Sequence, residues 1–305
     1  MDIGVVAGGY ANAAAQDTFC AGATCTISII YDQSPNGSHL QPSPKGQRSG
    51  TLNAATATAL KLTLNGHEVY GVQILTGSGY RSRCTGCGVP LPLPLGTAWG
   101  AATGDSPETE YMVTSQNGKQ EPTTTEGCCF DYGNAETDSN DDNDGTMEAI
   151  YYGGGVSWDF GSTGARTSSF VMADLENGLF AGFNPAPAAA SNTQTIASNT
   201  PLQYNYVTAV VVGDTAAQNS GKGRFAIYGA DATTGALKTM YDGIRPTLAG
   251  YVPMKKQGSI ILGTGGDNSD SGTGEWFEGV MASGAATLVT VNAVQANIVA
   301  AGYGK

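Results

Sequence analysis

The segment 204–212 reads Tyr-Asn-Tyr-Val-Thr-Ala-Val-Val-Val, a composition of β-branched and aromatic residues that is typical of a β-strand. Seven other segments share this composition: Thr26–Tyr31, Val69–Leu75, Thr146–Tyr152, Phe170–Ala173, Arg224–Tyr228, Ser259–Leu262 and Trp276–Met281. Clusters of Gly, Asn, Asp or Pro separate them, as turns between strands require. Many short strands with such connections predict an all-β fold, either a β-sandwich or a barrel.

Two short helices are expected at the periphery of this fold. Residues 10–22 are rich in alanine, and residues 291–303 place Val291, Val294 and Ile298 on one helical face. Two stretches, 81–109 and 183–201, are predicted to be long loops. The strand pattern resumes after each loop and no internal repeat occurs, so we expect residues 1–305 to form a single domain.

The charge balance narrows the function. The chain has 14 basic and 26 acidic residues, a net charge of −12, whereas binding to a phosphate backbone needs a basic surface. Nucleic acid is therefore not an expected partner, and no apolar run is long enough to suggest a membrane span. His39 and His67 are the only histidines, which argues against a multi-histidine metal centre and weakens a Ser-His-Asp triad. If the protein is an enzyme, carboxylates are the expected catalytic groups, without a metal or cofactor.

The six cysteines form three close pairs: Cys20 with Cys25, Cys84 with Cys87, and Cys128 with Cys129. An even number at short spacing indicates disulfides and an oxidising compartment, with pairing between neighbours the simplest of the connectivities. The alternative for Cys84 and Cys87 is a redox pair or half of a zinc site, but no second Cys-x-x-Cys or nearby histidine completes a ligand set. Asn36-Gly37-Ser38 is a glycosylation sequon, which is used only in a secreted eukaryotic protein.

Cys128 and Cys129 are adjacent in the chain. A disulfide between neighbouring residues closes an eight-membered ring and strains the peptide between them, and such strain is concentrated at functional sites. In the alternative, each cysteine pairs with a distant partner. The residues alone do not decide between the two.

An acidic run follows the two adjacent cysteines. It consists of Asp131, Glu136, Asp138, Asp141, Asp142, Asp144 and Glu148. Asn140-x-Asp142-x-Asp144 resembles the start of a calcium loop, but Tyr151 occupies the position where that loop needs a bidentate glutamate. The run is predicted to be a solvated acidic loop.

Two further segments contain candidate catalytic acids. Asp174 and Glu176 would share a face of an extended chain, where like charges raise one pKa. Alternatively, the Asn177-Gly178 dipeptide indicates a hairpin turn. Asp267 follows the strand-like Ser259–Leu262 within a glycine-rich segment that allows close approach to a ligand.

The glycine-rich segment 263–268 also admits other readings. It lacks the spacing and the following helix of a nucleotide-binding motif. Asp267, Ser269, Ser271, Gly272 and Glu278 fall near the ligand offsets of an EF-hand, but the flanking segments are strand-like where an EF-hand has helices. An ordinary loop aspartate is the simplest alternative.

Three segments together carry a family resemblance. They are Gly-Cys-Cys-Phe-Asp-Tyr-Gly-Asn-Ala-Glu-Thr at 127–137, Met-Ala-Asp-Leu-Glu-Asn-Gly-Leu-Phe at 172–180 and Gly-Gly-Asp-Asn-Ser at 265–269. These closely resemble the fungal family 54 α-L-arabinofuranosidases, and weaker similarity extends over nearly the whole chain. The double-cysteine motif is the most specific part of the resemblance.

The resemblance implies a β-sandwich of the jelly-roll or concanavalin-like type that removes terminal arabinofuranosyl groups with retention of configuration. Matching the motifs makes Glu176 the nucleophile and Asp267 the general acid/base. Cys128 and Cys129 would form a vicinal disulfide against the sugar. The remaining residues expected to bind the sugar are Asp174, Asn177, Gly266 and Trp158.

The resemblance also implies a setting and leaves alternatives. We expect a secreted, extracellular, monomeric glycosidase that acts on plant cell-wall arabinan or arabinoxylan. Relative to the family pattern, an initial segment with another cysteine pair and a C-terminal arabinose-binding domain are missing, and absence of the latter should weaken polymer binding without removing the chemistry. The alternatives are a non-catalytic carbohydrate-binding sandwich and a related glycosidase such as a β-D-xylosidase.

Overall fold

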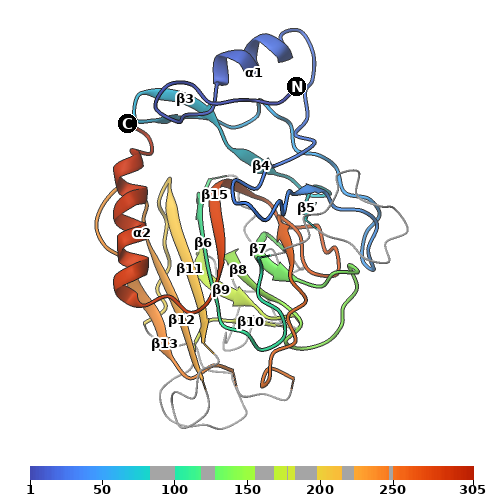
Figure 1. The fold of residues 1–305 in the computed structure, drawn as a ribbon, viewed down its shortest axis with the longest axis vertical. Coiled ribbons are helices and arrows are strands. Elements are labelled where there is room, and N and C mark those ends of the chain that lie inside the picture. Colours follow the sequence, from blue (N-terminus) through green and yellow to red (C-terminus); the bar gives the residue numbers. More distant parts are fainter. Residues whose placement is uncertain are drawn as a thin grey trace.

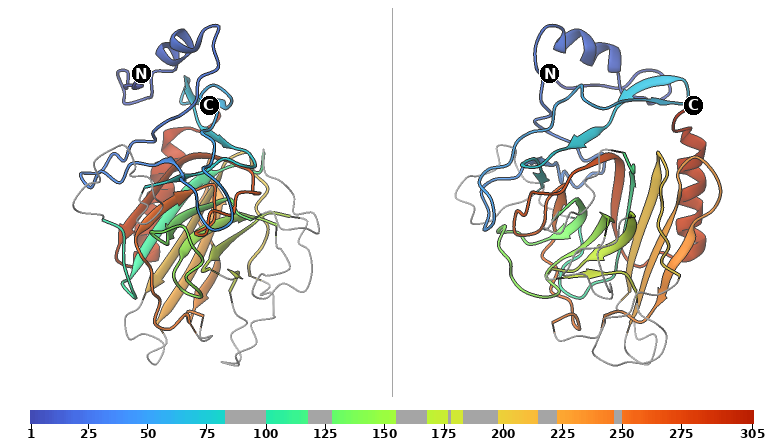
Figure 2. Two further views of the ribbon diagram at one scale, coloured as in Figure 1. Left: turned by 90° about the vertical axis from the view of Figure 1, so that its right-hand side faces the viewer. Right: turned by 180° about the vertical axis from the view of Figure 1, so that it is seen from behind.

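Two antiparallel β-sheets face each other (Figures 1 and 2). A hydrophobic core fills the space between them. The computed structural model describes residues 1–82, 100–117, 128–154, 168–176, 178–182, 198–214, 223–246 and 250–305. Only two helices occur in these ranges. The predicted all-β sandwich with short peripheral helices is therefore confirmed.

The first sheet has seven strands in the order β1-β5-β14-β7-β8-β9-β10. Their bounds are β1 Gln41–Pro42, β5 Tyr80–Arg81, β14 Ser259–Leu262, β7 Asp131–Ala135, β8 Glu148–Gly153, β9 Phe170–Asp174 and β10 Leu179–Phe180. All neighbouring strands are antiparallel. Strands distant in sequence, such as β14 and β7, are therefore direct neighbours in this sheet.

The second sheet has six strands in the order β13-β12-β11-β6-β15-β4. Their bounds are β13 Lys238–Gly243, β12 Arg224–Asp231, β11 Val207–Asp214, β6 Glu108–Thr114, β15 Gly274–Ser283 and β4 Val72–Ile74. A separate hairpin consists of β2 (Lys61–Leu64) and β3 (His67–Tyr70). The segment 204–212 thus lies at the centre of the second sheet, where β11 pairs with both β12 and β6.

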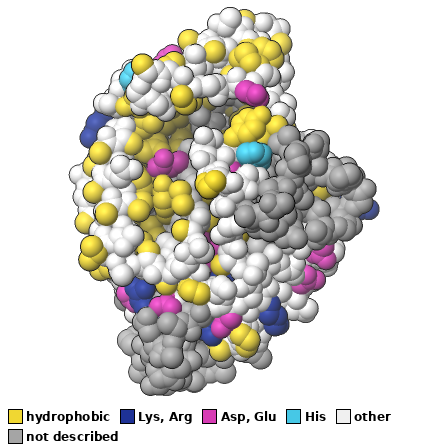
Figure 3. All heavy atoms as spheres, viewed as in Figure 1, with side chains coloured by type: hydrophobic (Ala, Val, Ile, Leu, Met, Phe, Trp, Pro, Cys, Tyr) yellow, Lys and Arg dark blue, Asp and Glu magenta, His cyan; other side chains and the backbone are white. Residues whose placement is uncertain are grey.

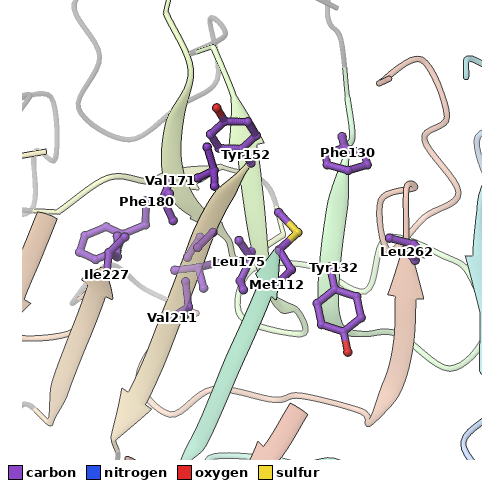
Figure 4. Close-up of a cluster of buried hydrophobic side chains, with 14 of the residues drawn as sticks. Met112, Phe130, Tyr132, Tyr152, Val171, Leu175, Phe180, Val211, Ile227 and Leu262 are labelled. Atoms are coloured by element: carbon purple, nitrogen blue, oxygen red, sulfur yellow. The ribbon is translucent and has the colours of Figure 1, made fainter. Parts of the chain in front are cut away.

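The core between the sheets is built from alternate residues of each strand. Tyr152 and Val171 of the first sheet and Val211 and Ile227 of the second are buried there (Figure 4). Because side chains alternate between the two faces of a strand, the intervening residues of the first sheet point to its other face. Burying a Val or Ile side chain contributes about 1.5–3 kcal/mol, so this row of contacts holds the two sheets together.

The two helices lie outside the sandwich. α1 (Ala13–Cys20) is capped by Asn12, whose side chain accepts a hydrogen bond from the Ala15 amide, and α2 (Leu288–Ala301) is capped by Thr287 in the same way. α2 buries Val291 and Ile298 against the outer face of the second sheet. Among the described residues, no helix is long and apolar enough to cross a bilayer.

α2 leaves part of this outer face uncovered. Figure 3 shows a hollow of hydrophobic side chains beside the helix. A cavity of about 380 Å³ lies there between α2 and strands β6 and β15, lined in part by Tyr111, Val280 and Val294.

Several sequence predictions need correction. Thr26–Tyr31 is not a strand, because Thr26 and Ile30 each form only an isolated bridge to a loop. Val69–Leu75 is split at Gly71 into β3 and β4, which belong to different sheets. A side chain at Gly71 would come within 2.8 Å of Phe277, so the chain passes too close to β15 for any larger residue.

Candidate active site

A cavity of about 430 Å³ opens beside the first sheet. It is lined by residues from five distant stretches: Arg48, Ser49, Cys128, Cys129, Asp141, Met147, Asp174, Glu176, Gly265, Gly266, Asp267, Ser269, Asp270 and Ser271. Glu176 and Asp267, predicted as catalytic from separate motifs, therefore lie in one cavity. So do Cys128, Cys129, Asp174 and Gly266.

The register of the first sheet explains this convergence. Asp174 of β9 is paired with Ala149 of β8, and Asp131 of β7 is paired with Tyr151 of β8. Directly paired residues share a face, and because their neighbours Ala173 and Tyr132 belong to the core, both aspartates point away from it. The cavity lies on this outer face.

Glu176 occupies the turn of the β9–β10 hairpin. Leu179 pairs with Asp174, so the hairpin that the Asn-Gly dipeptide indicates is confirmed. The chain is not extended at Glu176, however, because φ is +62° there. This conformation costs a non-glycine residue on the order of 1 kcal/mol. The Glu176 amide donates a 3.0 Å hydrogen bond to Asp174 Oδ1, and Tyr251 donates one of 2.9 Å to the Glu176 carbonyl.

Asp267 lies in the glycine-rich turn that follows β14. Its Oδ1 accepts hydrogen bonds from the amide and hydroxyl of Ser269, at 2.9 and 2.5 Å. Its Oδ2 lies 3.0 Å from Nε of Arg48, whose side chain is 62% exposed. The next residue, Asn268, is buried and donates a 2.7 Å hydrogen bond to the Pro44 carbonyl, which fixes the turn against the segment that carries Arg48.

Cys128 and Cys129 form a disulfide across a cis peptide bond. The Sγ atom of Cys129 lies 3.5 Å from Oδ2 of Asp174, so the disulfide and the aspartate border the same part of the cavity. Ser271 also fixes the pair, because its amide and hydroxyl both donate 2.8 Å hydrogen bonds to the Cys128 carbonyl. Of the two arrangements the sequence left open for these cysteines, the structure has the vicinal one.

The carboxyl groups around the cavity are unusually buried. Burial raises the pKa of Glu176 to about 11, and the negative charges of Glu136 and Asp174 act in the same direction. Burial likewise raises the pKa of Glu136 and of Asp174 to about 7. Burial also raises the pKa of Asp131, which faces Asp174. In this arrangement these groups therefore hold protons that isolated carboxyls would release.

Arg81 places a positive charge beside this buried cluster. The guanidinium is fully buried, and burial lowers its pKa to about 10, so it stays charged at neutral pH. It donates hydrogen bonds to the carbonyl of Glu136 and, at 2.5 Å, to the carbonyl of Gly266. Arg81 thus ties the end of β7 to the turn that carries Asp267.

Sequence reasoning missed part of this site and misjudged another part. Glu136 and Asp131 were assigned to a solvated acidic loop, but both are fully buried beside the cavity, whereas Asp138, Asp141 and Asp144 of the same run are half-buried. Arg48 and Arg81 had no recognisable pattern, because their roles arise from contacts with residues more than 50 positions away.

Four predicted residues lie outside the described ranges. They are the sugar-binding candidates Asn177 and Trp158 and the two cysteines Cys84 and Cys87. A disulfide between Cys84 and Cys87 therefore stays a prediction, because the structure describes neither Cys84 nor Cys87.

The other cysteine pair and the EF-hand-like segment are both described. Cys20 is bonded to Cys25 at the end of α1, as predicted. The residues with EF-hand-like offsets do not gather around one point, since Glu278 interacts with Tyr303 instead of facing Asp267.

The buried carboxyls make the stability dependent on pH. Burial raises the pKa of Glu108, as of Glu136 and Asp174, to about 7, above the usual values near 4. Their contribution to folding is therefore complete below pH 4 and is lost as the pH rises through 7. We expect the melting temperature in scanning calorimetry to fall by several degrees between pH 5 and pH 8.

The variant Glu108→Gln provides the control for this prediction. The amide of this variant cannot ionise, and position 108 is buried on β6 away from the cavity. The melting temperature of the variant should therefore fall less steeply over the same pH interval. A melting temperature that rises from pH 5 to pH 8 would show that these carboxyls are ionised in the fold without cost.

Two acidic side chains that line one cavity, as Glu176 and Asp267 do, are the catalytic arrangement of most glycoside hydrolases. A family model supports this assignment and makes it specific. The model described as "Alpha-L-arabinofuranosidase B, catalytic" matches residues 1–304. The chain belongs to this family.

Relatives and a solved structure agree with the family. The chain is 47% identical over 305 residues to the probable alpha-L-arabinofuranosidase B of Aspergillus terreus. This match covers 97% of this chain and 53% of the relative. It is 44% identical over 309 residues to a Trichoderma koningii protein named arabinofuranosidase/B-xylosidase, covering 99% and 54%. The chain thus spans about half the length of the curated relatives it matches.

One similar solved structure is an arabinofuranosidase complexed with arabinofuranosyl-alpha-1,2-xylobiose. Its TM-score is 0.80 at 42% identity, and the match covers 98% of this chain and 56% of the other. The family resemblance was seen in three short motifs of the sequence. The family model, the relatives and this structure confirm it.

Proposed function

We propose that residues 1–305 form one catalytic unit of a retaining, exo-acting α-L-arabinofuranosidase, which removes terminal arabinofuranosyl groups by double displacement. The observation that carries the proposal is the presence of Glu176 and Asp267 in one cavity, on turns that follow different strands of one sheet. The complex of the related arabinofuranosidase with arabinofuranosyl-xylobiose supports the substrate class.

In the first step Glu176 attacks the anomeric carbon while Asp267 protonates the departing oxygen. The transition state resembles an oxocarbenium ion, and the attacking carboxylate of Glu176 stabilises its positive charge. Because glycosidic oxygens are poor leaving groups, the proton from Asp267 must arrive as the bond breaks.

In the second step Asp267 takes a proton from water, which then displaces Glu176 from the sugar. Before substrate binds, Oδ2 of Asp267 pairs with Arg48 and its Oδ1 accepts two hydrogen bonds from Ser269. The Arg48 pair is weak because the arginine is largely exposed. We infer that a leaving group entering beside Arg48 separates this pair and takes the place of Arg48 at Oδ2 of Asp267.

The cavity accounts for action at a chain end. About 430 Å³ is enough for a single furanose with bound water, and the Cys128–Cys129 disulfide supplies an apolar wall for the carbon face of the sugar. Asp174 lies against the disulfide and is placed to accept a hydrogen bond from a sugar hydroxyl.

The setting of the enzyme is part of the proposal. Disulfides at Cys20–Cys25 and Cys128–Cys129 favour an oxidising, extracellular location. We infer a secreted monomer that acts on arabinan or arabinoxylan from plant cell walls and needs no cofactor, since the two carboxylates supply all the chemistry.

The proposal is tested by incubating the protein with 4-nitrophenyl α-L-arabinofuranoside and following 4-nitrophenol release, with proton NMR of the first sugar formed. We expect release, with the α anomer appearing first. Binding without release would favour the non-catalytic sandwich, and the β anomer would show inversion and contradict the double displacement.

A β-D-xylosidase activity is the second candidate function, because the T. koningii relative carries that name beside arabinofuranosidase. Arabinofuranose and xylopyranose present similar hydroxyl patterns to a cavity. The same assay with 4-nitrophenyl β-D-xylopyranoside measures it, and we expect a lower kcat/KM than for the arabinofuranoside.

A further inference from the structure

Glu136 is a buried carboxyl beside the cavity to which the mechanism above gives no part. It follows the last residue of β7 and has no exposed surface. Thr146 donates a hydrogen bond to its Oε1 atom, and its Oε2 atom has no hydrogen-bond donor among the described residues. A buried carboxylate oxygen without a donor is costly, unless the oxygen carries or shares a proton.

The Oε2 atom of Glu136 faces Glu176. A β-carbon placed on Gly266 would collide with Oε2 of Glu136 and would lie 2.9 Å from Oε2 of Glu176. The two carboxyl groups therefore meet at the backbone of Gly266, where the absence of a side chain leaves room for both.

The surrounding backbone fixes this meeting. Arg81 donates hydrogen bonds to the carbonyls of both Glu136 and Gly266, so the residue that carries the first carboxyl and the residue between the two are attached to one buried guanidinium. These contacts hold the backbone of Glu136 against the backbone of Gly266.

The charges around the pair are mostly negative. Glu136 and Glu176 face Arg81 of β5, Asp174 of β9, Asp267 after β14, and Asp138 and Asp141 from the loop after β7. Two buried carboxylates facing each other in such a field cannot both be ionised, and a pair of this kind holds one proton in common.

The shared proton creates a requirement for catalysis. Burial raises the pKa of both carboxyls, so the pair keeps its common proton before substrate binds, and that proton blocks the attack whenever it lies on Glu176. A nucleophilic carboxylate must lose this proton before it can bond to the anomeric carbon.

We propose that Glu136 is a positioning residue that accepts the proton of Glu176 as the reaction begins and then donates a hydrogen bond to the nucleophile; this rests on the proposed function. The O–H bond at Glu176 Oε2 breaks and one forms at Glu136 Oε2. The net charge of the pair stays at −1, and no other reactant is involved. Positive charge developing on the sugar favours the transfer, because it stabilises the anion at Glu176 more than at Glu136.

Two variants of similar volume separate this role from simple packing. Glu136→Gln keeps a neutral donor to Glu176, whereas Glu136→Met fills the space without one. Loss of a charge-assisted hydrogen bond disfavours the Glu176 anion, so the acidic limb of the kcat/KM profile in Glu136→Met should move upward by about one pH unit or more. In Glu136→Gln the limb should move by less than half as much.

The matched control is Glu110→Gln. Glu110 is as fully buried as Glu136, but it lies on β6 and its Oε1 atom accepts from the Asn134 amide, away from the cavity. Its acidic limb should coincide with that of the unmodified protein. Calorimetry on each variant shows whether the fold is intact. If Glu136→Met does not fold, Glu136→Asp, which withdraws the carboxyl by one methylene, should shift the limb in the same direction by a smaller amount.

The outcomes are distinct. Folded Glu136→Met or Glu136→Asp with an unmoved acidic limb would overturn the role of Glu136, as would a shift in Glu136→Gln equal to that in Glu136→Met. If the unmodified protein releases no 4-nitrophenol at any pH, the proposed function itself fails, because there is then no kcat/KM profile to compare between variants.

Discussion

Replacing Glu176 by alanine is expected to lower kcat for 4-nitrophenyl α-L-arabinofuranoside by about 10⁴-fold or more, the scale seen when a catalytic nucleophile is removed. Glu176 is the group that would form the covalent bond to the sugar, and the sequence 175–178 between β9 and β10 contains no other carboxyl. The variant removes a buried carboxyl and leaves the left-handed backbone at position 176 almost as strained as before. Its melting temperature should therefore not fall below that of the unmodified protein.

Azide tests whether the lost group is the nucleophile. In Glu176→Ala the truncated side chain leaves space for a small anion next to the anomeric carbon, on the side from which Glu176 attacked. Azide should restore 4-nitrophenol release and yield the β-configured arabinosyl azide by a single displacement. Rescue with the α-configured product, or turnover within about tenfold of the unmodified protein without azide, would remove Glu176 from this role.

The sequence predicted that both candidate catalytic residues follow strands, but it did not predict every strand around them. The two catalytic candidates were found because each stands shortly after a strand-like segment, Phe170–Ala173 or Ser259–Leu262, and both segments are strands in the structure. Side chains at strand ends are placed by the register of the sheet, so local pattern and final position agree in these two cases.

Strands with polar residues on a buried face could not be predicted in the same way. β6 contains Glu108 and Glu110, which point into the sandwich, where Lys256 lies 3.4 Å from Glu108. β7 has the sequence Asp-Tyr-Gly-Asn-Ala, in which Asn134 donates hydrogen bonds to Glu108 and to the Ala102 carbonyl. The partners that make these residues tolerable in a core come from other strands, and composition within one strand does not reveal them.

The same limit applies to Glu136. Its neighbours in sequence are acidic, and an acidic run is usually solvated, but β7 continues directly into Glu136 and carries it under the turn of Gly266. Arg81 and Thr146, which stabilise it there, are 55 and 10 residues away. The burial of a carboxyl inside an acidic run can be predicted only when the strand pairing is known.

Replacing Asp267 by asparagine is expected to have an effect that depends on the leaving group. 4-Nitrophenolate departs without a proton, so Glu176 can still be glycosylated, whereas the second step loses its base. The glycosyl-enzyme should accumulate, giving a burst of 4-nitrophenol, a low kcat and a lowered KM. For an arabinosylated xylo-oligosaccharide, whose leaving oxygen needs protonation, we expect kcat/KM to fall by about 10²–10⁴-fold.

The control for Asp267→Asn is Asp242→Asn. Asp242 also pairs with an arginine, 2.7 Å from Nε of Arg224, but on the second sheet and away from the cavity, so its removal tests the loss of an arginine-paired aspartate alone. The Asp242→Asn variant should keep the kcat/KM of the unmodified protein on both substrates. Azide again separates the roles, because in Asp267→Asn it attacks the glycosyl-enzyme from the face opposite Glu176 and should give the α-configured azide, the reverse of the product from Glu176→Ala. Equal losses on both substrates, with no burst, would mean that Asp267 binds the sugar without transferring the proton.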